Sequence, residues 1–143
     1  MATTTLDNAL DAIVTGLATV SGLGSTTVAK YDHMVLQKAT AAMIAPSFSG
    51  QQERATTASW QQTHMVDITL SVRQVTTIAA MLASMAVLVP LVLAWFRSND
   101  ALGKTDVSCS LESITWEAGD DVLEDNGVVR KEVVVTVPVM IWM

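Results

Sequence analysis

The chain has 143 residues, of which 50% are hydrophobic and 15% are charged. This length fits one domain with a single core, and the apolar content excludes a disordered chain. Eight Lys and Arg residues against fourteen Asp and Glu residues give a net charge of -6 without a basic cluster, which disfavours tight nucleic-acid binding by counterion release. We therefore treat residues 1–143 as one domain, and its low charge content indicates that partners cover part of its surface.

The first predicted element is a helix over residues 6–20. Thr4 and Asp7 have the spacing of a capping box, and the apolar residues that follow recur on one helical face. A strand of small and apolar residues is predicted next, over residues 41–48. Pro46 inside this strand indicates a sheet edge or a β-bulge.

A polar connector over residues 49–59 is predicted to protrude from the domain as a loop, because it is rich in Gln, Thr and Ser. It offers a neighbour polar contacts but no core anchor, through Gln51, Gln52, Glu53 and Arg54. We expect this segment to contact a partner.

The clearest strand pattern covers residues 65–73, where apolar and polar residues alternate. One face carries Val66, Ile68, Leu70 and Val72. The other face carries Asp67, Thr69, Ser71 and Arg73. We expect the first face to meet the core and the second to meet water or a partner.

The run from residue 78 to residue 96 is apolar except for Ser84, and runs of about 18 or more such residues are typical of membrane spans. Pro90 interrupts the run, and single arginines flank it without a one-sided basic excess. Two interpretations stay open: a membrane span, or a buried helix capped by Thr76 or Thr77 and followed by a short helix that begins at Pro90. We favour the two helices. Their large apolar residues are expected on one stripe, formed by Ile78, Leu82, Met85 and Val89.

The last third of the chain is predicted to form two strands. Residues 107–116 alternate with one change of phase, which predicts a β-bulge, and an acidic hairpin connection follows over residues 117–127. The final strand, residues 128–143, has one continuous apolar face and further apolar residues on the other face, namely Val134, Met140 and Trp142. Such a strand is central in a covered sheet or part of an interface, and Pro138 argues against a fully central position.

These elements follow each other in the order helix, strand, strand, helix, strand, strand. Short connections between consecutive strands favour antiparallel pairing. The predicted fold class is a two-layer α+β domain with a mainly antiparallel four-stranded sheet covered by helices.

No constellation of residues indicates catalysis. The single cysteine, Cys109, excludes a disulfide within the chain and a cysteine metal cage. Neither His33 nor His64 has a second histidine or a cysteine at ligand spacing. The acidic stretch lacks the alternating oxygen ligands of a calcium loop. We expect no enzymatic activity, no metal and no cofactor.

In this arrangement the chain resembles the lambda-like tail terminator proteins of long-tailed phages over residues 41–143. The likeness lies in the strand over residues 41–48, the Ser/Thr-rich approach to Trp60, the alternating strand over residues 65–72, the helix interrupted near Pro90, the acidic hairpin after Trp116, and the strand end at residues 137–143. The resemblance implies a virion structural protein that closes into a ring, usually a hexamer. Such a ring caps the tail tube, stops its polymerisation and joins the tail to the head-side connector.

The partners implied are further copies of the chain, the major tail tube protein and the head-side connector or head-closure protein, with no membrane. DNA would pass through the lumen without specific binding, and we expect the acidic hairpin or the polar face of the strand over residues 65–73 to line that channel. The N-terminus shows no secretory signal, so we expect the host cytoplasm during assembly and the tail-neck region of the virion afterwards. The candidate contact residues are Gln51, Gln52, Glu53, Arg54, Asp67, Asp120, Asp121, Glu124, Met140 and Trp142. The alternatives are another neck or minor tail protein, or a small single-span membrane protein.

Overall fold

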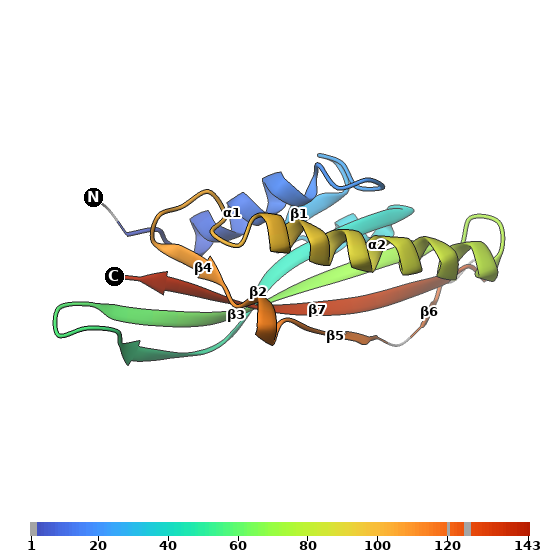
Figure 1. Ribbon diagram of the computed structural model, residues 1–143. Helices are drawn as coiled ribbons and strands as arrows, with labels where there is room; N and C mark the ends of the chain where they lie inside the picture. The colour runs from blue at the N-terminus through green and yellow to red at the C-terminus, as the bar shows by residue number, and fades with distance from the viewer. Residues whose placement is uncertain (1–2, 120, 125–126) are drawn as a thin grey trace.

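Two helices cover one face of a mixed β-sheet in the computed structural model, which describes residues 3–119, 121–124 and 127–143 (Figure 1). The helices are α1 (Leu6–Leu17) and α2 (Ile78–Ser98), and two short 3-10 turns are η1 (His33–Gln37) and η2 (Leu111–Ser113). The strands are β1 (Val28–Lys30), β2 (Thr40–Arg54), β3 (Trp60–Arg73), β4 (Val107–Cys109), β5 (Thr115–Ala118), β6 (Val122–Leu123) and β7 (Val129–Trp142).

The predicted fold class, an α+β domain with a four-stranded and mainly antiparallel sheet, was wrong. Within the described residues the sheet has seven strands in the order β1-β2-β3-β7-β4, while β5 and β6 pair with other parts of β7. Strand β1 runs parallel to β2 and the other pairs are antiparallel, so the sheet is mixed and open. The two strands that were missed, β1 and β6, have only three and two residues, too few to show an alternating pattern.

Helix α1 is amphipathic as predicted, with Leu10, Ile13 and Leu17 fully buried. Its N-cap is Thr5 and not Thr4, because the Thr5 hydroxyl accepts a hydrogen bond from the Asn8 amide at 3.1 Å. Thr4 instead donates its amide and its hydroxyl to the Asp106 carboxylate, both at 2.6 Å. The start of α1 is thereby held against the loop before β4.

Helix α2 is one continuous helix, so the predicted break at Pro90 was wrong. The predicted cap at Thr77 is confirmed, since its hydroxyl accepts from the Ala80 amide at 3.1 Å. The face of α2 that packs on the sheet is buried at Met81, Met85, Leu88, Val92 and Phe96. Two members of the predicted apolar stripe, Ile78 and Leu82, are exposed instead, because an all-apolar helix has no polar face to fix its rotation.

Strand β7 lies in the centre of the sheet between β3 and the shorter strands, although Pro138 argued against that position. On the side of β7 away from β3, the pairing is interrupted opposite Pro138. Cys109 at the end of β4 pairs with Val139, and Thr115 at the start of β5 pairs with Thr136. Turn η2 fills this interval, and the Ser110 amide donates to the Pro138 carbonyl at 2.9 Å. The predicted β-bulge in residues 107–116 is therefore a 3-10 turn between two short strands.

The main core lies between the helices and the sheet. The apolar faces predicted for β3 and β7 are confirmed, since Val66, Ile68 and Leu70 and the alternating residues from Val133 to Ile141 are buried there. A second, smaller cluster joins Val35 and Leu36 of η1 to Ala41 and Met43 of β2. Successive residues of β2 point to opposite faces, so η1 covers the face of the sheet away from the helices.

Candidate interaction surfaces

Strands β2 and β3 form a long ribbon, and we call its far end, residues 50–64, the arm. The β3 side of the arm pairs with the end of β7, and the turn of the arm projects beyond the rest of the molecule (Figure 1). The predicted connector over residues 49–59 is not a loop, since residues up to Arg54 continue β2 and pair with β3. The Arg54 guanidinium lies over the Trp60 ring at 4.6 Å and donates to the Thr57 carbonyl at 3.2 Å. These contacts stiffen the turn, and the exposed arm carries all four predicted contact residues from Gln51 to Arg54.

The base of the arm is a β-bulge, which confirms the irregularity predicted at Pro46. Pro46 pairs with Val66 and Gly50 with His64, so three residues of β2 lie opposite a single residue of β3. The Ser47 hydroxyl donates to the Met65 carbonyl at 3.2 Å and lies 2.8 Å from the Ser49 hydroxyl. The bulge is therefore held closed by its own side chains.

Sequence reasoning missed the residue at the centre of this bulge, Phe48. Its side chain is 86% exposed and its φ of 58° lies in the left-handed region, which is unfavourable for a residue with a Cβ. Gly50 follows, and a Cβ there would collide with the Thr63 carbonyl oxygen. The sequence did contain a signal for this site. Phe48 lies between two serines, and these are flanked by Pro46 and Gly50, which both disfavour regular strands.

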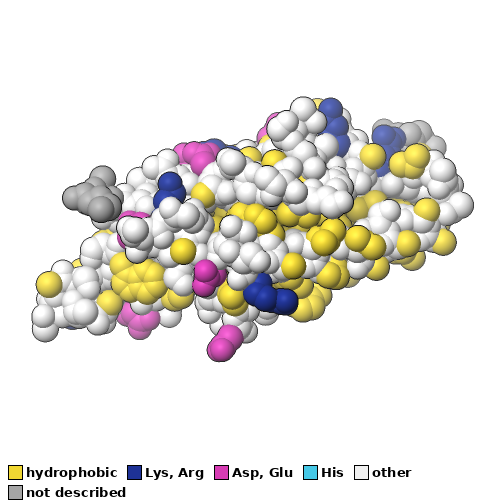
Figure 2. Space-filling model, turned by 45° about the horizontal axis from the view of Figure 1, so that its top comes forward, with side chains coloured by type: hydrophobic (Ala, Val, Ile, Leu, Met, Phe, Trp, Pro, Cys, Tyr) yellow, Lys and Arg dark blue, Asp and Glu magenta, His cyan; other side chains and the backbone are white. Residues whose placement is uncertain are grey.

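The outer face of α2 is apolar and exposed. Ile78, Leu82 and Val87 are all about half exposed or more, and no charged residue occurs on the helix before Arg97. Figure 2 shows hydrophobic side chains gathered over the half of the molecule that α2 crosses. By length and composition α2 could also cross a membrane, with a mean hydropathy of 2.3 over 18 residues and 22% of that stretch buried. These two properties alone do not separate a span from a helix that lies on its own sheet.

A groove of about 990 Å³ runs beside α2, between this helix and strands β5 and β7. We call it the α2–β5 groove. Its apolar wall includes Leu82, Ala86, Val89 and Trp116, and the Trp116 side chain is 55% exposed. Arg97, Glu117 and Lys131 provide its charges. The groove can receive an apolar side chain with a charged neighbour.

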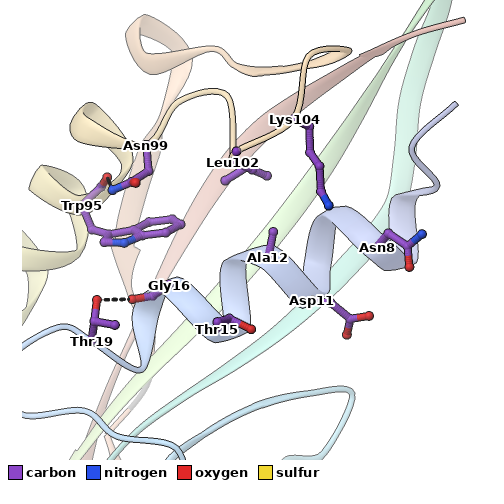
Figure 3. Close-up of a pocket in the computed structure, with 11 residues that line it drawn as sticks. Asn8, Asp11, Ala12, Thr15, Gly16, Thr19, Trp95, Asn99, Leu102 and Lys104 are labelled. Atoms are coloured by element: carbon purple, nitrogen blue, oxygen red, sulfur yellow. Dashed lines mark hydrogen bonds between the residues drawn. The ribbon is translucent and has the colours of Figure 1, made fainter. Parts of the chain in front are cut away.

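A second cavity of about 620 Å³ lies between α1 and the end of α2 (Figure 3). The Trp95 ring lies across Gly16 so closely that a Cβ at Gly16 would collide with it. Asp11 on the rim pairs with Lys30 at 2.7 Å, and Asn99 donates to the Trp95 carbonyl at 2.9 Å. Lys104 also lines the cavity, whose other walls come from the two helices and the turn after α2.

The structure places the other predicted contact residues in two groups. Glu53, Gln61 and Trp142 lie in one row across β2, β3 and β7, as do Gln51, Thr63 and Met140. Met140 and Trp142, both half-buried, thus lie alongside the arm, opposite Thr63 and Gln61 of β3.

The acidic residues form the second group, away from the arm. Asp121 pairs with Lys131 at 3.1 Å, and Glu124 pairs with Arg73 at 2.9 Å. Asp120 lies outside the described residues. These ion pairs already engage two of the acidic side chains of the predicted hairpin.

The polar face of β3 is only partly open. Asp67 accepts a hydrogen bond from the Thr136 hydroxyl at 2.8 Å across the β3–β7 pair. Ser71 is fully buried. Of the polar side chains expected to face a channel, Asp67 and Thr69 are partly accessible.

Burial shifts the pKa of the Cys109 thiol and of the His64 ring. Burial raises the pKa of the Cys109 thiol to about 12, which keeps it protonated and unreactive. Burial also lowers the pKa of His64, whose ring lies 3.1 Å from Gln62. In the part of the chain that the structure describes, no group of three His, Cys, Asp or Glu residues could hold a metal ion.

No known family model matches this chain, and no curated protein matches it.

Proposed function

We propose that the chain is a structural protein of a phage virion, which closes into a ring on the tail tube, stops tube polymerisation and joins the tail to the head-side connector. The observation that carries the proposal is the pair of unlike exposed surfaces at different ends of one small molecule: the rigid arm with Phe48 at its base, and the apolar α2–β5 groove. A closed ring of identical subunits requires two different side surfaces that fit each other.

The sequence supports the same proposal. The segments that resemble lambda-like tail terminators include the bulged strand around Pro46, the alternating strand β3 and the C-terminal strand β7. A net charge of -6 suits a ring through which DNA passes without being held, because phosphate contacts need clustered cations. The partners proposed are copies of the chain, the tail tube protein and the head-side connector.

The proposal is tested by adding the purified chain to tail tube protein encoded beside it while the tubes polymerise. We expect shorter tubes with one ring at a single end in negative-stain electron micrographs. Tubes of unchanged length, or chain bound along their sides, would identify another neck or minor tail protein. Recovery of the expressed chain only from membranes, by detergent, would instead support the single-span membrane protein that the length of α2 allows.

A further inference from the structure

Phe48 is held at the surface against two ordinary preferences of an aromatic residue. Its ring is exposed, and its backbone adopts the left-handed conformation. The bulge that holds it is closed by the hydrogen bond from Ser47 to Met65 and by tight pairing at Gly50. A strained backbone that is fixed by its surroundings is typical of residues kept for contact with a partner.

The α2–β5 groove has the complementary properties. It is concave and lined mainly by apolar side chains, and Trp116 leaves more than half of its surface open there. Contacts that bury aromatic side chains in such pockets carry most of the affinity of protein interfaces. The groove lies in the half of the molecule that α2 crosses, whereas the arm projects from the other end (Figures 1 and 2).

We infer that Phe48 of one copy of the chain seats in the α2–β5 groove of the next copy. This inference rests on the proposed ring, and it names the two surfaces that close it. A molecule cannot fill its own groove, because its arm points away from it (Figure 1). Each copy therefore offers an arm to one neighbour and a groove to the other, which is the head-to-tail contact that a ring requires.

Charge also matches between the two surfaces. Glu53 on the arm and Arg97 at the groove have opposite charges, and neither has an ion pair with any residue that the structure describes. These charges fit a contact in which Phe48 enters the apolar part of the groove while Glu53 meets Arg97.

A lipid surface fits the same face of α2 less well. Helices that lie in a membrane interface carry Lys and Arg along their polar side, which attract anionic lipids. Helix α2 has one basic residue, Arg97, in its last turn. A second copy of the chain, with its unpaired Glu53, accounts for both the apolar groove and the one basic residue of α2.

The first test measures self-association of the full chain by analytical ultracentrifugation. Phe48→Ala should weaken association by at least about tenfold, as expected for an aromatic anchor. Met34→Ala is the matched control, because Met34 is 63% exposed on η1, outside both surfaces, and should associate like the wild type. Thermal melting of each variant verifies that it folds.

The second test exchanges the two charges. Glu53→Arg and Arg97→Glu should each weaken association, and the double variant should recover most of the loss, because the exchanged charges attract again. Rings that form equally well with Phe48→Ala would overturn the inference and leave the proposed ring intact. A wild-type chain that binds phosphatidylglycerol vesicles and never self-associates, alone or on tubes, would overturn both.

Discussion

Gly16 lies where the Trp95 ring crosses helix α1, and it decides how closely the two helices approach (Figure 3). In an ordinary helix interior, Gly→Ala stabilises a protein by about 0.5–1 kcal/mol. Here the added methyl group meets the Trp95 ring. That ring is held by its edge-to-face contact with Phe96, and the two ring centroids lie 4.9 Å apart. We expect Gly16→Ala to lower the free energy of unfolding by about 1–2 kcal/mol, measured by urea denaturation. Gly24→Ala is the control, since no atom of the described residues lies within 4 Å of its Cβ position, and it should change stability by less than about 0.5 kcal/mol. A Gly16→Ala variant more stable than the wild type would mean that the ring does not rest on α1.

Phe48 provides the opposite case, a residue whose removal should stabilise the fold. Phe48→Gly relieves the left-handed strain and loses almost no buried surface, so the free energy of unfolding should rise by about 0.5–1 kcal/mol in urea denaturation. Phe48→Ala keeps a Cβ and should show no such gain. A loss of stability in Phe48→Gly would show that the ring supports the bulge, and that its exposure has a structural reason.

At the scale of elements, the arm contributes no buried side chain and joins the sheet through the pairing of Gln61 to His64 with the end of β7, so it should be separable from the fold. Replacing residues 52–62 by an Asn-Gly turn would join β2 and β3 directly beyond Gln51 and Thr63, which are paired in the register. We expect a folded protein whose melting temperature stays within a few degrees, because the side chains removed are exposed or half-buried. Tube capping should be lost, as seen by electron microscopy. An unfolded product would show that the arm belongs to the folding unit, and retained capping would remove the arm from the assembly surface.

The elements that could be predicted are those whose apolar pattern fits only one type of secondary structure and only one buried face. Strands β3 and β7 alternate over many residues, so their buried faces follow directly from the sequence. Helix α2 could be located, but not oriented, because almost every position on it is apolar. Strand β1 has three residues, and its parallel pairing with β2 depends on tertiary contacts that no local pattern records. The bulge was expected at Pro46, whereas the exposure of Phe48 follows from backbone geometry at the bulge that the alternation of residues does not reveal.

At the scale of the whole molecule, the charges bear on the proposed channel. In the acidic hairpin, Asp121 and Glu124 are matched by Lys131 and Arg73, so this segment presents less free negative charge than its sequence indicates. Asp67, on the polar sheet face, has no ion pair with any residue that the structure describes. For a channel wall that must not hold phosphate, this favours the sheet face over the hairpin.

The arm and the groove also predict how two defective variants behave together. Phe48→Ala has a defective arm and an intact groove, whereas Ala86→Arg fills the groove with a long charged side chain and leaves the arm intact. Each alone should remain monomeric at concentrations where the wild type forms rings. Mixed in equal amounts, they should form a dimer and nothing larger, because the only functional contact joins the arm of the Ala86→Arg copy to the groove of the Phe48→Ala copy. Native mass spectrometry resolves this dimer from rings by mass, and labelling one variant with a heavy isotope identifies its composition. Closed rings containing both variants would require a different contact between subunits. Dimers of one variant with itself would indicate a symmetric interface, in which arm and groove do not meet.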